Sequence, residues 1–252
     1  MQAVIMSTYD PGPQLLDFKG MINSRDLGGM PLSGKLSFLS RLFVRSGAPQ
    51  TADPADLQDV LDYGVRTVID LRSAAELKKF GNPFQNMEGI EFHSIPLFKG
   101  DPELKDDPTM EFLRTHHLGD FYVIVAEEFG QAAVSVLRIL KDCRGTALFH
   151  CAHGKDRTGV ISACLYLLAG ASREDIIHNY EISYGYLEDF LAPLMAETED
   201  DMKHTLRSDR INMEIFLKHI DDNYGGNIRN LLRSKGMTDL EIEQLTAKCR
   251  GD

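Results

Sequence analysis

The segment from Phe149 to Gly159, with the sequence FHCAHGKDRTG, constrains the fold more than any other part of the chain. It follows a short apolar run at 146–149, which predicts a buried strand. It precedes an almost wholly apolar run at 160–169 that ends at Gly170, a pattern typical of a buried helix with a glycine stop. A strand that leads directly into such a helix predicts a sheet covered by helices.

The loop between this strand and this helix has the properties of an anion-binding site. Unpaired backbone N–H groups and the positive end of the helix dipole meet at a helix N-terminus. Cys151 stands at the start of the loop and Arg157 at its end. A positive field favours the thiolate, the nucleophilic form of cysteine, and a guanidinium can hold two oxygens of a phosphate. The Cys-x5-Arg spacing therefore predicts a site that cleaves phosphate esters through a covalent phosphocysteine.

The same segment resembles the active-site loop of the cysteine-dependent protein tyrosine phosphatases, which share His-Cys-x5-Arg-Ser/Thr. Its Gly-Lys-Asp-Arg-Thr-Gly form is similar to the atypical bacterial and fungal branch, which includes secreted mycobacterial and listerial phosphatases. Further segments resemble that branch from about Gly20 to the end of the chain: NSRDLGG at 23–29, VIDLRS at 68–73 with Glu76, NYEIS at 179–183, and the tail from Tyr224 to Arg250.

The resemblance implies an enzyme that acts on phosphotyrosine, in some relatives also on phosphoserine and phosphothreonine or on phosphoinositides. The expected partner is therefore a phosphotyrosine protein or another phosphomonoester, with a phosphoinositide as a further candidate. No cofactor and no metal are expected. A metal bound by His150, Cys151 and His153 is disfavoured because no second pair of ligands is present.

The resemblance also assigns expected roles to individual residues. The phosphate-binding loop would consist of Cys151, Ala152, His153, Gly154, Lys155, Asp156 and Arg157. We expect Thr158 to donate its hydroxyl to the thiolate or to the departing sulfur. We expect His150 to hydrogen-bond the loop rather than to act as a base. Supporting roles fall to Arg25, Asp26 and Arg72, which lie in the two other motifs.

The general acid is less constrained than the nucleophile. The chain contains no tryptophan, so the Trp-Pro-Asp acid loop of the larger family is absent. Similar atypical enzymes place an aspartate inside the phosphate loop, which corresponds to Asp156, and nearby negative charge favours its protonated form. Asp156 could instead brace the loop. The next candidates are then Asp70, at the end of a neighbouring predicted strand, and the loop at 101–107.

Two further alternatives stay open from the sequence. Lys155 is either a surface charge or an attraction for a second phosphate, as in phosphoinositide phosphatases. The whole chain is either an enzyme or a catalytically silent phosphate-binding module. Because Cys151, Arg157, Thr158 and an acid candidate are all present, we favour the enzyme. Cys143, Cys164 and Cys249 are expected to be structural.

Composition excludes several other functions. A formal net charge of −11 argues against nucleic-acid binding, and no Lys/Arg block predicts a membrane anchor. No apolar run approaches the ~18 residues of a transmembrane helix, and no secretory signal is visible in the first twenty residues. The four cysteines have no regular spacing, which favours free thiols and a cytoplasmic protein. Export of relatives without an obvious signal leaves secretion open.

The order of predicted elements indicates an α/β fold. We expect a mostly parallel central sheet with helices on both faces, similar to the cysteine phosphatases, and a helical C-terminal extension. The 252 residues show no linker, so one phosphatase domain is expected over 1–252. Within it we expect an irregular arm at 1–19, a catalytic core at 20–182 and the extension at 183–252. Residues 191–210 are either a mobile lid or a solvated helical face.

Local patterns predict individual elements. Strands are expected at 42–45, 65–71 and 90–95. Asp53 with Pro54, and Ser73 with Glu76, are helix-start signals. Apolar residues at helical spacing from Phe121 to Leu140 predict one long amphipathic helix that ends by Gly145. An exposed loop near the mouth of the site is expected at 99–108.

Replacing the predicted nucleophile gives the first test. Cys151→Ser should abolish turnover and retain phosphate binding, because a serine hydroxyl is protonated at neutral pH while the rest of the loop is intact. We expect turnover to fall by more than about a thousandfold. Steady-state kinetics and a phosphate or vanadate titration measure the two properties. A serine variant that keeps turnover above that level contradicts a cysteine nucleophile.

Overall fold

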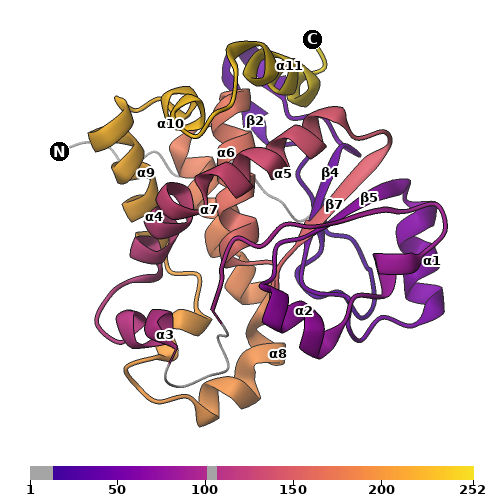
Figure 1. Cartoon of the computed structure of the whole chain (residues 1–252), viewed down its shortest axis with the longest axis vertical. Helices are drawn as coiled ribbons and strands as arrows, with labels where there is room; N and C mark the ends of the chain where they lie inside the picture. Colours follow the sequence, from indigo (N-terminus) through magenta and orange to yellow (C-terminus); the bar gives the residue numbers. More distant parts are fainter. Residues whose placement is uncertain (1–13, 101–106) are drawn as a thin grey trace.

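A five-stranded sheet with the order β1-β4-β7-β5-β6 forms the centre of the fold (Figure 1). The strands are β1 (Arg25–Asp26), β4 (Phe43–Ser46), β5 (Val65–Asp70), β6 (Glu91–Ser94) and β7 (Thr146–His150). All neighbouring pairs are parallel except β1 with β4. The mostly parallel sheet is therefore confirmed. The structure is a computed structural model that describes residues 14–100 and 107–252. The first thirteen residues of the predicted arm and most of the predicted loop at 99–108 lie outside the described residues.

The register of the three central strands brings their carboxyl ends to one edge of the sheet. In β7, His150 pairs with Ser46 of β4 on one side and with Asp70 of β5 on the other. Ligands of parallel sheets bind beyond the carboxyl ends of the strands. The register thus places the segment that starts at Cys151 beside the ends of both neighbouring strands.

Alternation of side chains along the strands explains why helices cover both faces of the sheet. Phe43, Ile69 and Phe149 point into the larger apolar core. Their sequence neighbours Val44, Val68 and Leu148 point into a smaller core on the opposite face. Since successive strand residues face opposite ways, a strand buried on both faces is apolar throughout. The smaller core is closed by α1 (Pro54–Asp62), by η3 (Pro83–Asn86) and by residues 16–21.

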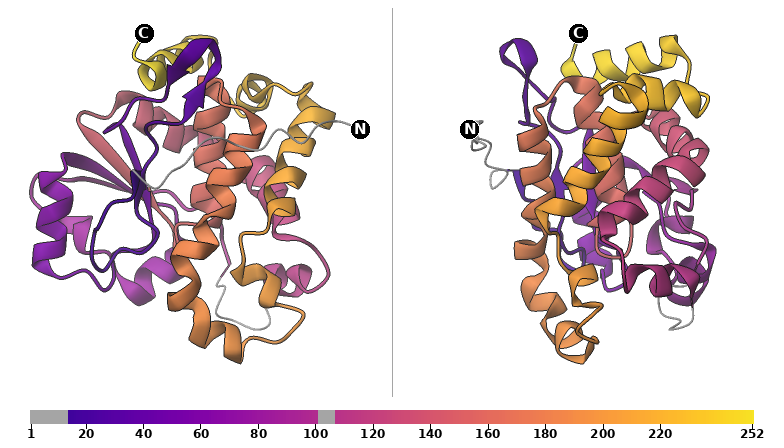
Figure 2. Two further views of the ribbon diagram at one scale, coloured as in Figure 1. Left: turned by 180° about the vertical axis from the view of Figure 1, so that it is seen from behind. Right: turned by 90° about the vertical axis from the view of Figure 1, so that its left-hand side faces the viewer.

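A buried helix, α6 (Asp156–Ala169), organises the larger face. It is buried at 12 of its 14 positions and ends at Gly170 in the left-handed conformation, as the apolar run predicts. It packs against α4 (Leu118–Glu128), α7 (Arg173–Glu181), α10 (Ile228–Ser234) and α11 (Asp239–Arg250). Figures 1 and 2 show these helices on the side of the sheet opposite α1. Because nearly every side of α6 is covered, its N-terminus is held rigidly at the sheet edge.

The remaining elements extend this layer. They are α2 (Ala74–Phe80), α3 (Pro108–Leu113), α5 (Gly130–Asp142), α8 (Ser183–Glu197), η4 (Lys203–Leu206), α9 (Arg210–Tyr224) and a small hairpin formed by β2 (Pro31–Leu32), η2 (Ser33–Lys35) and β3 (Leu36–Ser37). α8 projects at the end of the molecule opposite α11 (Figure 2). Among the described residues, no helix is both long enough and apolar enough to traverse a bilayer.

Both predicted helix starts are confirmed. Asp53 accepts hydrogen bonds from the backbone of Ala55 and Asp56, and Pro54 is the first residue of α1. Ser73 and Glu76 form the reciprocal capping box that starts α2. Both caps satisfy N–H groups that have no partner within their helix.

The prediction of one helix over 121–140 is wrong. Two helices, α4 and α5, replace it, with the break at Phe129 (φ −104°, ψ 13°). Glycine at position 130 weakens helix continuity, and a Cβ there would lie 2.6 Å from the Lys235 side chain. Lys235 also donates from Nζ to the Glu127 carbonyl at the end of α4 (3.2 Å). The side chain that follows α10 thus packs directly at the break.

Candidate active site

The loop from Cys151 to Lys155 connects the end of β7 to the first residue of α6. Gly154 adopts a positive φ of 64°, and a Cβ on it would lie 2.3 Å from the Ser46 backbone. Only glycine meets both conditions, since other residues rarely adopt this conformation and the backbones are too close for a side chain. The loop therefore curls tightly against the end of β4.

The carbonyl groups of the loop are bound from one side. The Ala48 N–H donates to the Ala152 carbonyl (2.9 Å), and Asn23 Nδ2 donates to the carbonyls of His153 (3.1 Å) and Gly154 (3.0 Å). In a trans peptide the C=O and the following N–H point in opposite directions, and the described residues contain no cis peptide. The N–H groups that follow these carbonyls consequently face the other side of the loop, where they can bind an anion.

Arg45 of β4 strengthens this arrangement. Its guanidinium donates to the carbonyls of Gly154 (2.7 Å) and Lys155 (3.2 Å) and to Asn179 Oδ1 (3.0 Å). Burial lowers the pKa of Arg45, a cost that nearby groups including Cys151 partly offset. The charges of Lys155 and Arg157 also interact with Cys151. The Cys151 thiol, which is only 1% exposed, thus lies among three cationic side chains.

Arg157 is held by Glu76 of α2. The guanidinium donates from Nη1 to Oε2 (2.6 Å) and from Nη2 to Oε1 (3.0 Å), and the Ser73 N–H donates to the same carboxylate (2.8 Å). Burial disfavours the charge of Arg157, but its pairing with Glu76 and Cys151 raises its pKa overall. Because Glu76 fixes the plane of the guanidinium, the pair preorganises a two-point phosphate contact. The sequence shows Glu76 as a helix cap, and nothing local reveals this second role.

His150 hydrogen-bonds the loop in the neutral form. Asn82 Nδ2 lies 2.9 Å from His150 Nε2, and His150 Nδ1 lies 3.2 Å from the Cys151 carbonyl. Since an amide nitrogen can only donate, Nε2 accepts and the proton resides on Nδ1. Burial lowers the pKa of His150, in agreement with a neutral ring. This geometry suits the predicted supporting role, because the donor orients the peptide that follows Cys151.

Asp70 lies behind His150 and is fully buried. Arg72 holds it with Nε (3.0 Å to Oδ1) and Nη2 (2.7 Å to Oδ2), and Asn82 Nδ2 donates to Oδ2 (3.0 Å). Burial alone would raise the pKa of Asp70, but His150, Arg72 and Asn82 outweigh it and bring the pKa to about 2. Asp70 and Arg72 thus form a closed ion pair that supports the His150 side of the loop.

Asp156, the first residue of α6, is placed differently from Asp70. Its side chain is 20% exposed, and Oδ1 accepts a hydrogen bond from the Tyr122 hydroxyl (2.5 Å). Lys155 Nζ lies 3.4 Å from the same oxygen and donates to the carbonyls of Thr205 and Arg207 (both 2.7 Å). The ammonium of Lys155 is therefore buried and bound to the segment between α8 and α9. Of Asp156 and Asp70, only Asp156 is open to solvent, and the third predicted candidate, the loop at 101–107, lies outside the described residues except for Asp107.

The remaining predicted site residues differ in how they are connected to the loop. Thr158 Oγ1 is buried and has no hydrogen-bond partner in the described part of the chain. Arg25 donates to the Asn23 carbonyl (3.3 Å) and to Ser183 Oγ (2.9 Å), so it reaches the loop through Asn23. Asp26 turns away from the loop and accepts from the backbone of Gly28 (2.6 Å) and Arg41 (2.7 Å).

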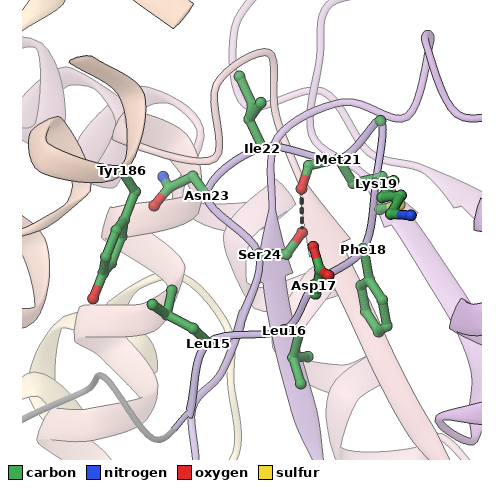
Figure 3. A pocket seen from close by; sticks show the side chains of 11 residues that line it. Leu15, Leu16, Asp17, Phe18, Lys19, Met21, Ile22, Asn23, Ser24 and Tyr186 are labelled. Atoms are coloured by element: carbon green, nitrogen blue, oxygen red, sulfur yellow. Dashed lines mark hydrogen bonds between the residues drawn. The ribbon is translucent and has the colours of Figure 1, made fainter. Parts of the chain in front are cut away.

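A cavity of about 510 Å³ lies between residues 15–24 and Tyr186 of α8 (Figure 3). Asn23, which binds the loop carbonyls, is part of its lining. The cavity therefore adjoins the side of the loop that the carbonyls face, rather than the side of the predicted phosphate position. Sequence patterns gave no indication of it, because its lining comes from an irregular segment and a distant helix.

The Arg157–Glu76 pair gives a second test. Arg157→Lys conserves charge but cannot make the bidentate contact, so we expect a loss of about 3 kcal/mol or more of transition-state stabilisation. Glu76→Gln keeps the size of the side chain and removes its charge, and it should reduce kcat/KM less than Arg157→Lys does. Steady-state kinetics of both variants measure this order. Near-normal kinetics of Arg157→Lys would remove Arg157 from the site.

Comparison with known proteins places the chain in a family. Residues 16–250 match the tyrosine phosphatase family. A tyrosine-protein phosphatase of Nostoc commune is 34% identical over 147 residues, which cover 58% of this chain and 49% of the relative. A Cupriavidus necator protein whose name assigns it provisionally to the tyrosine-protein phosphatases is 31% identical over 173 residues, 66% of this chain and 61% of the relative.

An inositol diphosphatase of Arabidopsis thaliana is 25% identical over 156 residues, which cover 58% of this chain and 64% of the relative. The chain thus spans between half and two thirds of the length of these relatives. The family match, in contrast, extends over nearly the whole chain and includes every residue of the phosphate loop. This protein belongs to the tyrosine phosphatase family.

Proposed function

We propose that this protein hydrolyses phosphotyrosine through a phosphocysteine at Cys151. The observation that carries the proposal is the joint placement of Cys151 at the start of the tight loop and of Arg157 in the first turn of the helix that follows it. The loop carbonyls are bound on one side, which leaves the opposite N–H groups for a phosphate, and Glu76 fixes the guanidinium. A nucleophile, a bidentate cation and backbone donors that converge on one point suit phosphoryl transfer.

In the first step, the Cys151 thiolate forms an S–P bond while the P–O bond to the leaving group breaks. The leaving oxygen takes up the proton of the Asp156 carboxyl, which becomes a carboxylate. Arg157 and the loop N–H groups hold the phosphoryl oxygens, on which negative charge is redistributed. No net charge or atom is lost, since the proton from Asp156 balances the phenoxide that departs.

In the second step, water attacks phosphorus and the S–P bond breaks. The Asp156 carboxylate takes a proton from that water, the Cys151 thiolate is regenerated, and inorganic phosphate is released. The buried hydroxyl of Thr158, which has no partner within the described residues, is available to donate to the departing sulfur. A buried hydroxyl without a partner costs about 1–3 kcal/mol, which is offset if it stabilises the thiolate.

Asp156 is a better candidate than Asp70 for the acid. The Arg72 guanidinium holds the pKa of Asp70 below its ordinary value, and both oxygens of Asp70 are occupied by Arg72 and Asn82. Asp156 is partly exposed at the same end of α6 as Arg157. We therefore assign proton transfer to Asp156 and a positioning role to Asp70.

An exposed aromatic side chain supports phosphotyrosine as the substrate. Phe190 of α8 is 53% exposed, and its ring centre lies 6.0 Å from that of His153 in the phosphate loop. An aryl ring of the substrate could pack on this pair. Lys155, the candidate contact for a second phosphate, is instead bound to two backbone carbonyls. Both features favour an aryl phosphate over a phosphoinositide.

A substrate panel tests this choice. A phosphotyrosine peptide should be hydrolysed faster than its phosphoserine counterpart and faster than a phosphoinositide, with inhibition by vanadate. Phe190→Ala should reduce kcat/KM for phosphotyrosine about fivefold, since an aromatic pair contributes about 1 kcal/mol, and should leave phosphoserine unaffected. Preferred hydrolysis of the phosphoinositide would contradict the assignment. Vanadate-sensitive hydrolysis of none of the three substrates would favour a silent phosphate-binding module.

Leaving-group dependence tests the acid. Asp156→Asn should slow the hydrolysis of phenyl phosphate, whose phenoxide is a poor leaving group, about a hundredfold or more. It should slow the hydrolysis of a highly activated aryl phosphate much less. It should also flatten the alkaline limb of the kcat pH profile, where the acid would deprotonate. Asp70→Asn is the control, with little leaving-group dependence. Equal slowing of both substrates by Asp156→Asn, with the alkaline limb retained, would make Asp156 a loop brace.

A further inference from the structure

Three buried side chains from different helices form a hydrogen-bonded chain that leads to the carboxylate of Asp156, and Tyr122 is the member that contacts it. Tyr122 of α4 donates to Asp156 Oδ1, and its hydroxyl lies 2.6 Å from that of Tyr180 of α7. Asn212 of α9 donates from Nδ2 to the Tyr180 hydroxyl (3.3 Å). Tyr122, Tyr180 and Asn212 are each at most 1% exposed. Burying polar groups costs free energy unless they form hydrogen bonds with one another, as these do.

The direction of the hydrogen bonds in this chain is fixed from both ends. The Gly119 N–H donates to Asn212 Oδ1 (3.3 Å), so the amide must present Nδ2 to Tyr180. Tyr122 donates its one hydroxyl proton to Asp156, so the proton between the two tyrosine hydroxyls comes from Tyr180. Burial raises the pKa of both tyrosines well above its ordinary value, so both hydroxyls keep their protons and act as donors.

The two oxygens of Asp156 are consequently distinct. Oδ1 receives the Tyr122 hydroxyl and lies near Lys155 Nζ. None of the hydrogen bonds or ion pairs of Asp156 within the described residues involves Oδ2. A proton shared with the leaving group is therefore carried by Oδ2, while Oδ1 is occupied by a permanent donor.

We propose that Tyr122 is a positioning residue for proton transfer, which fixes the rotation of the Asp156 carboxyl so that Oδ2 exchanges the proton with the leaving group and then with water. This inference rests on the proposed role of Asp156. Tyr180 and Asn212 act through Tyr122, because they hold its hydroxyl in the donating orientation.

Tyr122→Phe tests the proposal, because it removes one hydroxyl and keeps the ring. We expect kcat for phenyl phosphate to fall about tenfold, a part of the typical contribution of a general acid, and kcat for an activated aryl phosphate to change less than threefold. The alkaline limb of the kcat profile should move to higher pH, since the carboxylate has lost a donor. Tyr180→Phe should give a smaller effect of the same kind.

Tyr166→Phe is the matched control. Tyr166 is an equally buried tyrosine of α6, and its hydroxyl donates to the Leu27 carbonyl (3.1 Å) rather than toward Asp156. It should change neither the leaving-group dependence nor the pH profile, and thermal unfolding shows whether each variant folds. Should Tyr122→Phe slow both substrates equally, or leave the alkaline limb in place, its role is structural and the proposal fails.

The double variant separates this inference from the proposed function. In the Asp156→Asn background, Tyr122→Phe should have no further effect on leaving-group dependence, because its effect passes through the carboxyl. If Asp156→Asn slows phenyl phosphate more than the activated aryl phosphate and Tyr122→Phe does not, only the role of Tyr122 is overturned. If neither single variant slows the two substrates differently, the role of Asp156 is overturned as well.

Discussion

The binding of the loop carbonyls by Arg45 and Asn23 is the interaction on which the rest of the site depends. These two side chains donate four hydrogen bonds to three carbonyls behind the loop, those of His153, Gly154 and Lys155, so the following N–H groups are available in front. A buried guanidinium costs several kcal/mol of desolvation, and Arg45 Nε has no hydrogen-bond partner within the described residues. This cost is offset by the hydrogen bonds that Arg45 donates to the loop carbonyls and by its interaction with Cys151.

Two separate hydrogen-bond networks reach the two ends of the loop. On one side, Arg72, Asp70 and Asn82 fix the neutral His150, which donates to the Cys151 carbonyl. On the other side, Asn212, Tyr180 and Tyr122 reach Asp156. The first network orients the peptide that follows the proposed nucleophile, and the second orients the proposed acid. The two networks share no residue, although the charges of Lys155 and Arg157 interact with both Cys151 and Asp156.

Much of the fold follows from the sequence because the signals are local. The apolar runs of β5 and β7, the caps at Asp53 and Ser73, and the glycine stop after α6 are patterns of a few residues. The break between α4 and α5 does not follow, and the side chain that packs at it, Lys235, is more than a hundred residues away. Local periodicity contains no information about such a contact.

The same distinction applies to the site. Cys151 and Arg157 share one motif, so their proximity was predictable from spacing alone. Glu76 binds Arg157 over 81 positions, and Tyr122 binds Asp156 over 34. Tyr122 belongs to an ordinary apolar helical pattern, which predicts that a tyrosine at this position is a core residue. Its role is visible only once α4 is packed against α6.

The central claim is that Cys151 carries the phosphoryl group during turnover. Rapid acid quench of the wild-type protein during hydrolysis of an aryl phosphate, followed by proteolysis and mass spectrometry, measures this directly. A phosphoryl group on the peptide that contains Cys151, absent from the Cys151→Ser variant, is the predicted result. Turnover with no phosphorylated Cys151 at any quench time, or with the phosphoryl group on another residue, would contradict the account.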